Sequence, residues 1–261
     1  QLSLIERTGV ISKLGRQRRW QDALGVLQQL AEDGLDPDVF AYAAALNACT
    51  KGSEWASALF LLEDMRSGRV VPNTVAYNAA ISASGQGAQW DIALILLRDM
   101  REQRTDADTI TCNTLAAALG QTMRWTRALT LVARLVEEGI EPDLFTCNTL
   151  LSGLERAGCW ERAVALLVDA ENFGGSPADQ ISYNTLLGAC SRAAEWQAAL
   201  QVVRDMGAAS LRTDSISWAS VTSACERARE LPAGVRLAAR LALAQDRPTS
   251  GAAAPRGGAP G

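Results

Sequence analysis

The sequence predicts an all-α protein, an α-solenoid in which helix–turn–helix repeats stack into a right-handed superhelix, and three observations lead to this. Six of the seven tryptophans recur at intervals of 35, 35, 35, 35 and 36 residues: Trp20, Trp55, Trp90, Trp125, Trp160 and Trp196. An alanine follows each of them three residues later: Ala23, Ala58, Ala93, Ala128, Ala163 and Ala199. Within each repeat, apolar residues return at helical spacing. A fixed period of roughly 20–50 residues indicates units that bury their apolar faces only by stacking.

Each repeat is expected to contain two helices, and the unit that begins at Thr109 shows why. The apolar positions of its first helix are Ile110, Thr114, Leu115, Ala118 and Leu119. After a polar break at Gln121, a second helical run follows through Trp125, Ala128, Leu129, Val132, Leu135 and Val136. Gly139 and Pro142 then end it, because glycine is favoured just past a helix and proline cannot continue one.

Seven units tile residues 4–245 as one array, with the following boundaries: 4–38, 39–73, 74–108, 109–143, 144–179, 180–214 and 215–245. The one 36-residue unit places its extra residue in the turn Gly174–Pro177, since loops tolerate insertions. Residues 246–261 are rich in proline, glycine and alanine and predict a disordered tail. The chain begins at Gln1 inside a repeat, which predicts a longer parent protein whose targeting peptide lies upstream.

The composition argues against several functional classes. Hydrophobic residues make up 48% and charged residues 21%, as in folded soluble domains, and no apolar run is long enough for a membrane span. The six cysteines follow the repeat rather than a CxxC pattern, and histidine is absent, so we expect reduced core thiols and no metal site. Neither a GxSxG elbow nor a phosphate-binding P-loop is present. We therefore expect no catalytic residue, no cofactor and no small-molecule substrate.

Recurring motifs define the family that the chain resembles. A tyrosine–asparagine pair, or the asparagine alone, stands near the start of four first helices: Tyr77-Asn78, Tyr183-Asn184, Cys112-Asn113 and Cys147-Asn148. Units end on Pro37-Asp38, Pro72-Asn73, Pro142-Asp143, Asp108, Asp179 and Asp214. Over seven units, about nine-tenths of its length, the chain resembles the pentatricopeptide repeat family, with tryptophan as a bulky variant at the second helix. Tetratricopeptide repeats usually run about 34 residues and carry an LG pair that these units lack.

The resemblance implies that the first helices line a concave face that binds single-stranded RNA, one base per repeat. In this family two residues per unit select the base, and here those base-selecting residues are Thr8, Asp38, Ala43, Asn73, Asn78, Asp108, Asn113, Asp143, Asn148, Asp179, Asn184 and Asp214. The family's code assigns G to Thr with Asp and U to Asn with Asp, so the predicted site is 5′-GNUUUU-3′. Ala219 lacks a polar group, and the seventh unit is expected to cap the stack.

Two further sets of residues have roles implied by the resemblance. An apolar residue that wedges between successive bases stands at Ile5, Phe40, Val75, Ile110, Phe145, Ile181 and Ile216. A basic residue that approaches phosphate stands at Arg16, Lys51, Arg156, Arg192 and Arg227, with Gln86 and Gln121 in the two middle units. The competing interpretations are an ordinary core role for the wedge residues and helix capping for the asparagines. For the tryptophans, packing between helices is favoured over base stacking.

Two classes of function remain after this reasoning. The first is a non-enzymatic, RNA-binding adaptor in organelle RNA processing or stability, in a mitochondrion or chloroplast, with protein partners at its flanking regions. The second is a protein-interaction scaffold of the tetratricopeptide type. The net charge of −4 and pI of about 5.1 argue against nucleic acid, but the basic residues align in one repeat position while most acids fall in second helices or loops.

Overall fold

The computed structural model describes residues 3–121, 124–173 and 178–230, which contain thirteen α-helices and no β-strand. The helices are α1 (Leu4–Arg16), α2 (Trp20–Glu32), α3 (Val39–Gly52), α4 (Trp55–Ser67), α5 (Thr74–Gln86), α6 (Trp90–Glu102), α7 (Thr109–Gln121), α8 (Trp125–Glu137), α9 (Leu144–Ala157), α10 (Trp160–Phe173), α11 (Gln180–Ala193), α12 (Trp196–Ala208) and α13 (Ser215–Arg227). The predicted second half of the seventh unit and the tail lie outside the described residues.

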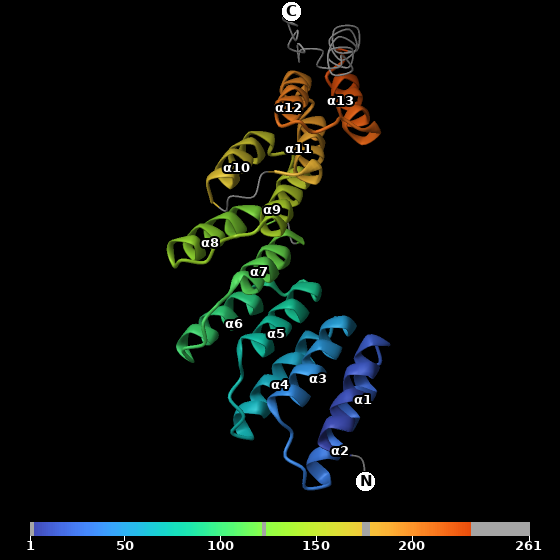
Figure 1. Ribbon diagram of the computed structural model, residues 1–261, viewed down its shortest axis with the longest axis vertical. Coiled ribbons are helices and arrows are strands. Elements are labelled where there is room, and N and C mark those ends of the chain that lie inside the picture. Colours follow the sequence, from blue (N-terminus) through green and yellow to red (C-terminus); the bar gives the residue numbers. More distant parts are fainter. Residues whose placement is uncertain (1–2, 122–123, 174–177, 231–261) are drawn as a thin grey trace, which may run out of the picture.

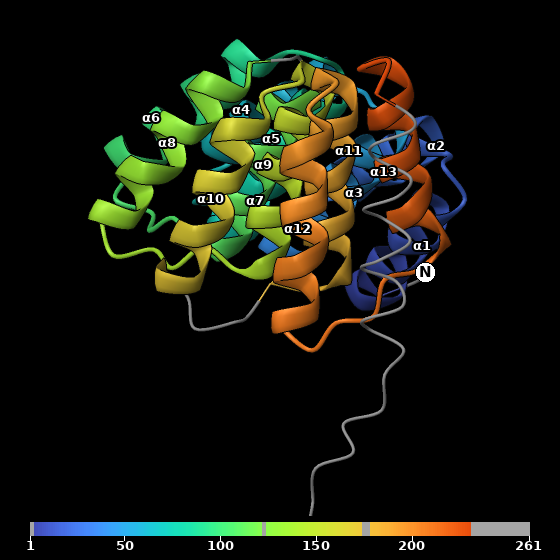
Figure 2. The same ribbon diagram turned by 90° about the horizontal axis from the view of Figure 1, so that it is seen from above.

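The odd-numbered helices form one continuous row. Each packs against the next, α1 on α3 and so on to α13, while each even-numbered helix packs against its own partner and the following odd-numbered helix. Among the described helices, the backbones of even-numbered helices do not approach one another as closely as those of neighbours in the row, although some of their side chains meet. The row follows an arc, with α4, α6, α8 and α10 on its outer side (Figure 1), and the view from above separates the two layers (Figure 2). The predicted all-α solenoid is confirmed.

The residues that close the units also start the next first helix. Asp38, Asn73, Asp143, Asp179 and Asp214 each adopt an extended backbone and accept a hydrogen bond from the backbone N–H three residues later. Asp108 accepts the same bond from Thr111, at 2.8 Å. A side-chain acceptor here satisfies one of the free N–H groups at a helix N-terminus. The residues that close the units therefore cap the first helices, and the asparagines inside the first helices do not.

The six periodic tryptophans pack between units, as the sequence predicts, and are half-buried. A Cβ atom added at Gly52 would lie 2.5 Å from Trp20, and one at Gly87 would lie 2.6 Å from Trp55, so glycine makes room for each ring at the end of the next first helix. A cation covers another of these rings: the Arg124 guanidinium lies 4.0 Å from the Trp90 ring centroid. The alanine after each tryptophan is fully buried, where the two helices of a unit meet.

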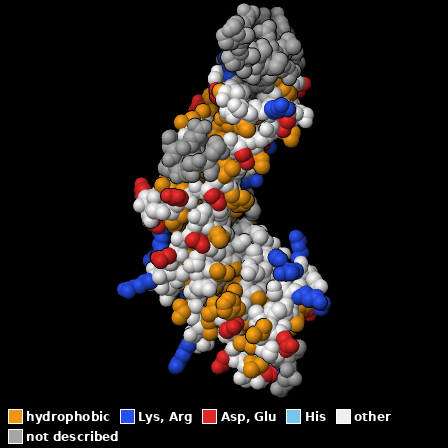
Figure 3. All heavy atoms as spheres, viewed as in Figure 1, with side chains coloured by type: hydrophobic (Ala, Val, Ile, Leu, Met, Phe, Trp, Pro, Cys, Tyr) orange, Lys and Arg blue, Asp and Glu red, His pale blue; other side chains and the backbone are white. Residues whose placement is uncertain are grey.

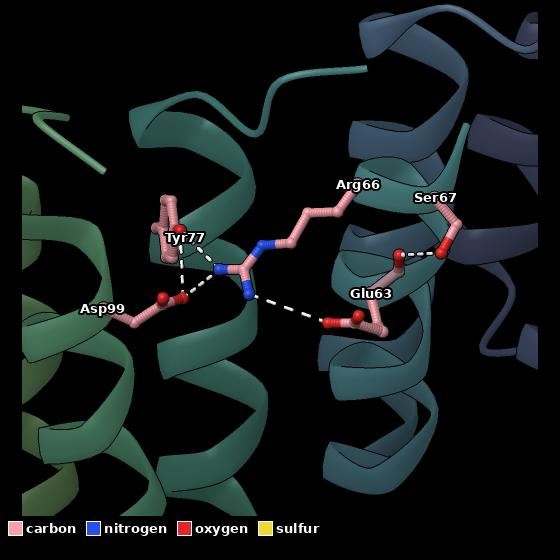
Figure 4. Close-up of polar contacts among 5 residues, drawn as sticks. All are labelled: Glu63, Arg66, Ser67, Tyr77 and Asp99. Carbon is pink, nitrogen blue, oxygen red and sulfur yellow. Dashed lines mark hydrogen bonds and ion pairs between the residues drawn. The ribbon is translucent and has the colours of Figure 1, made fainter. Parts of the chain in front are cut away.

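Polar contacts between units add to the apolar core. Tyr42 donates a hydrogen bond to Asp64 at 2.8 Å, and Tyr77 donates one to Asp99 at 3.0 Å, so each ties the two helices of its unit together. Arg66 of α4 reaches across to α5 and α6, where it donates to the Tyr77 hydroxyl at 2.9 Å and pairs with Asp99 (Figure 4). Because partly buried ion pairs are screened less than exposed ones, this contact helps to fix the stacking of these two units.

All six cysteines have free thiols, as the sequence predicted. Cys49, Cys112, Cys190 and Cys225 are buried in the core. Burial raises the pKa of Cys49 and Cys112 to about 11 and that of Cys190 to about 12, because an ionised thiolate is poorly solvated there. These thiols therefore stay protonated at neutral pH and act as small packing residues.

Candidate nucleic-acid interface

The seven predicted wedge residues form an exposed apolar row along the odd-numbered helices. Their exposed fractions run from 55% for Val75 to 83% for Ile5, although all seven are large aliphatic or aromatic side chains. The residue that follows is buried in six of the seven units, as Ala76 is after Val75. An ordinary core role is therefore wrong for this row. We call the face that carries it the inner face, because it points away from the even-numbered helices.

Four predicted base-selecting pairs meet beside this row. The amide nitrogen of the asparagine donates to the carboxylate that closes the same unit: Asn78 to Asp108 at 3.0 Å, Asn113 to Asp143 at 3.0 Å, Asn148 to Asp179 at 3.4 Å and Asn184 to Asp214 at 3.3 Å. The members of each pair are about thirty residues apart in sequence, and only the return of the chain through the second helix brings them together. A capping interpretation does not apply to these asparagines.

A hydroxyl group joins each of these pairs, and sequence reasoning missed it. The third residue of the following unit donates to the asparagine oxygen: Thr111 to Asn78 at 2.7 Å, Ser182 to Asn148 at 2.6 Å, Ser217 to Asn184 at 2.7 Å, and Thr146 to Asn113. All four hydroxyl-bearing residues are fully buried. The sequence did carry a signal for this contact: serine or threonine stands at the third position of a unit only where the preceding unit carries the asparagine.

The paired carboxylates are held in their ionised form. Burial raises the pKa of Asp108, but the hydrogen bonds that it accepts from Thr111 and Asn78 outweigh burial and hold this pKa below its usual value. Asp143 and Asp179 have a lowered pKa for the same reasons, with Asn113 and Ser182 among their donors. For Asp214 the first cause is the backbone N–H of Ser217. At neutral pH each carboxylate is thus a pure acceptor.

The first two units lack this arrangement. Thr8 donates its hydroxyl to the carbonyl of Leu4 in its own helix, at 2.9 Å, and no hydrogen bond joins it to Asp38 within the described structure. Ala43 has no polar side chain to offer Asn73, which caps α5 through Ala76 at 3.0 Å. Ala219 of the seventh unit is exposed. The structure therefore brings four of the six predicted pairs into contact and leaves two apart.

A hollow on the inner face combines two of the predicted roles. It has a volume of about 340 Å³ and lies between α5, α7 and α9. Ile110 and Phe145 of the wedge row line it together with Asn113, and Ser82 and Ala117 lie among its small residues. The site thus offers apolar walls and two amides, those of Asn113 and Gln86, which suits a flat, polar-edged group.

The predicted phosphate-contacting residues fall into two sets. They follow the wedge residues by eleven positions in the first helix, about three turns, so both sets share one helix face. Arg16, Lys51 and Arg227 are exposed and have no ion pair in the described parts of the chain. Arg156 instead donates to the carbonyl of Gly120 at 2.6 Å, and Arg192 pairs with Glu155 at 3.5 Å. On the face shown in Figure 3, basic and acidic side chains are interspersed.

Neither a membrane-spanning helix nor a metal site is found among the described residues. No helix there is long and apolar enough to cross a membrane, and no group of three or more acidic or cysteine side chains is placed to hold a metal ion.

Comparison with known proteins places the chain in a family. A model of the pentatricopeptide repeat domain matches residues 8–87 and 95–156, more than half of the chain. The chain belongs to the pentatricopeptide repeat family. A second model, of the single repeat, matches residues 75–104, 145–174 and 181–210. These three matches fall in the third, fifth and sixth units of the array. No curated protein matches the chain significantly in sequence.

Several solved structures share this fold. The pentatricopeptide repeat protein PPR10 from maize is 15% identical over 96% of this chain, with a TM-score of 0.59. PPR10 in complex with an 18-nt psaJ RNA element is 21% identical over 94% of this chain, with a TM-score of 0.61. The PPR domain of Arabidopsis thaliana protein-only RNase P 1, in complex with tRNA, is 11% identical over 69% of this chain, with a TM-score of 0.58 and 95% of that domain covered. The chain spans 40% and 34% of the two PPR10 chains.

Proposed function

We propose that this chain is a sequence-selective adaptor for single-stranded RNA that takes one base per unit and prefers 5′-GNUUUU-3′. The observation that supports it most is the exposed wedge row with an asparagine–aspartate pair beside it in four successive units. A large apolar side chain loses favourable burial when it stays in water, so seven of them in register favour a flat apolar ligand that covers them. Stacked bases are such a ligand.

The polar pairs add selectivity to that stacking. In the hollow between Ile110 and Phe145, the Asn113 amide lies where the edge of an inserted base would be. One N–H of this amide is donated to Asp143, which leaves the second for a base carbonyl. Uracil presents such carbonyl acceptors beside its own N–H donor. The same arrangement around Asn78, Asn148 and Asn184 extends the preference to four consecutive uracils.

The small number of basic residues without protein contacts favours a moderate affinity for RNA. Arg16, Lys51 and Arg227 remain available for phosphates on the inner face, while Arg156 and Arg192 already contact protein groups. Because phosphate contacts dominate the strength of most nucleic-acid complexes, few free cations mean that stacking and base contacts carry more of the binding.

The biological role proposed here is that of a non-catalytic adaptor. RNA is the bound partner in the PPR10 and RNase P structures that share this fold, which supports RNA as the ligand of this chain. By resemblance we propose action on organelle transcripts, in a mitochondrion or chloroplast, through masking, stabilising or exposing a U-rich segment. Any chemistry on the RNA would come from a protein partner or from another part of the parent protein.

A binding selection on randomised single-stranded RNA tests this function. The expected outcome is enrichment of sequences with a run of four uracils preceded, two positions upstream, by guanine. A matched control is the variant with Asn78, Asn113, Asn148 and Asn184 all changed to alanine, which should still bind RNA through the wedge row but without a preferred base. Enrichment of no RNA at all, with binding to peptides instead, would favour a tetratricopeptide-type scaffold and contradict the proposal.

A further inference from the structure

We propose that the buried hydroxyls of Thr111, Thr146, Ser182 and Ser217 are positioning residues that set the preference for uracil over cytosine in the preceding unit. Each base would then be read by three residues from two units: the asparagine, the aspartate that closes its unit, and the hydroxyl that opens the next. The inference rests on the proposed RNA-reading function and deepens it, because it assigns selectivity to residues outside the two recognised positions of a unit.

The contacts around the fifth base position show the geometry. Ser182 Oγ lies 2.6 Å from the side-chain oxygen of Asn148 and 2.9 Å from a carboxylate oxygen of Asp179. The Asn148 amide nitrogen lies 3.4 Å from the same carboxylate oxygen. The three side chains therefore form a closed triangle. Thr111 closes the same triangle with Asn78 and Asp108, with oxygen–oxygen distances of 2.7 and 2.8 Å.

This triangle permits one orientation of the asparagine amide. A carboxylate only accepts hydrogen bonds, so the amide NH₂ must face Asp179 and the amide oxygen must face Ser182. The backbone N–H of Asp179 points at Ser182 Oγ from 3.3 Å, which occupies a lone pair of the hydroxyl and leaves its proton for an acceptor. In the reverse orientation, the amide oxygen would face a carboxylate oxygen with no proton between them. The carboxylate thus sets the orientation of the amide, and the hydroxyl strengthens it by giving the amide oxygen a donor.

Amide orientation matters because uracil and cytosine have opposite hydrogen-bonding polarity at C4, and also at the neighbouring N3. Uracil presents a carbonyl oxygen at C4, an acceptor, where cytosine presents an amino group, a donor. An amide whose free N–H is directed to the base matches uracil, and one whose oxygen is directed there matches cytosine. A locked amide therefore separates the two pyrimidines, whereas an amide free to turn over accepts both.

A capping role explains the hydroxyls only in part: Ser182 and Ser217 complete capping boxes by accepting the backbone N–H of Asp179 and Asp214, at 3.3 Å each. The cap of each first helix uses the backbone N–H of the third residue, and this bond is equally present where that residue is alanine: Ala41 to Asp38 at 2.8 Å and Ala76 to Asn73 at 3.0 Å. The two alanines follow the two units that lack asparagine, those of Thr8 and Ala43. Hydroxyl and asparagine thus occur together across a unit boundary in all four cases, as a shared function requires.

The first experiment removes one hydroxyl. Affinities of the parent, Ser182→Ala and Ser182→Thr are measured for 5′-GAUUUU-3′ and for 5′-GAUUCU-3′, which differ only at the fifth base. Ser182→Ala should lower the uracil-over-cytosine ratio about threefold to tenfold, the value of one hydrogen bond, and Ser182→Thr should keep it because Thr111 and Thr146 fill that role elsewhere. The control is Ser84→Ala, which deletes an equally buried hydroxyl bonded only to the carbonyl of Ala80.

A second experiment builds the triangle where the chain lacks it, and so does not depend on a destabilised variant. Ala43→Asn with Asn73→Asp installs a pair in the second unit, and Ala76→Ser adds the hydroxyl. Uracil-over-cytosine selectivity at the second base should be clearly larger with the serine than without it. Equal selectivity with and without Ala76→Ser, or an unchanged ratio in Ser182→Ala, would overturn the positioning role while leaving the pairs intact. A parent that ranks the two RNAs equally contradicts the proposed function itself.

Discussion

The first two units (residues 4–73) and the next four (residues 74–214) share the same helix pairs and the same exposed wedge row, but they hold the base-selecting positions differently. In the first two, Thr8 bonds to its own helix and Ala43 offers no polar group. In the next four, asparagine, aspartate and a buried hydroxyl form one hydrogen-bonded set.

The predicted phosphate-contacting residues also differ between the two regions, but here it is the later units whose side chains are bonded to other protein groups. Arg16 and Lys51 in the first two units are exposed without an ion pair in the described structure, whereas Arg156 and Arg192 further along are bonded to Gly120 and Glu155. Exposed basic residues and hydrogen-bonded polar sets are thus found in different units of the same array. On the proposed function, the N-terminal units would supply charge that attracts any strand, and the later units would supply polar sets that distinguish bases.

The largest effect is expected in stability, which both regions owe to the same tryptophan packing. Trp125 packs against the apolar core and the backbone of α9 near Gly153, and Arg162 lies over its ring at 4.7 Å. Trp125→Ala should lower the free energy of unfolding by about 3 kcal/mol, at the lower end for a large-to-small change because the ring is only half-buried. Chemical denaturation followed by circular dichroism measures this. A cost below about 1 kcal/mol would mean that the tryptophans do not hold the units together.

The next effect tests whether the wedge row acts alike in both regions. Phe40 is 76% exposed in the first and Phe145 is 61% exposed in the second, so alanine at either position should leave the fold intact. Each change should weaken RNA binding by about tenfold, within the about 1–3 kcal/mol typical of one stacked base. The base preference should stay the same, because stacking tolerates any base. Unchanged affinity for Phe145→Ala, measured by fluorescence anisotropy, would exclude that side chain from the interface.

A smaller effect should separate the regions by their charge. Three free cations predict a slope of log affinity against log salt concentration of about −2, at about −0.7 for each single-strand phosphate contact. Arg16→Gln with Lys51→Gln should flatten the slope by about 1.4, whereas Arg156→Gln with Arg192→Gln should change it by less than half as much. Neither double variant should alter base preference. Equal flattening in both would show that Arg156 and Arg192 leave Gly120 and Glu155 to reach the strand.

The sequence was sufficient to predict the fold and the pairing, for a simple reason. A repeat shows its two helices and their exposed face through the period alone, and residues at the same place in successive units must lie in register. Asn148 and Asp179 were matched across one unit because the resemblance to the pentatricopeptide repeat family implies a shared role for these two positions, and the structure shows their contact. The exposed row could be proposed in the same way, although only the structure shows that Ile5 and Ile216 are not core residues.

Contacts that cross a unit boundary were harder to predict. Ser182 belongs to one unit and bonds to Asn148 of the unit before, so examining each unit by itself does not associate them. The engagement of Arg156 with Gly120 depends on how closely two helix ends approach, which the repeat period does not fix.

The central claim is that the Asn148–Asp179 pair reads the fifth base as uracil through its hydrogen-bonding edge. Its most direct test is a pair of titrations with 5′-GAUUUU-3′ and 5′-GAUUAU-3′ against the parent and against the double variant Asn148→Thr with Asp179→Asn. By the family's code this variant should favour A, so it should lose about tenfold or more on the first RNA and regain that affinity on the second, since an edge mismatch costs about 1–3 kcal/mol. If parent and variant rank the two RNAs identically, the fifth base is not read by this pair.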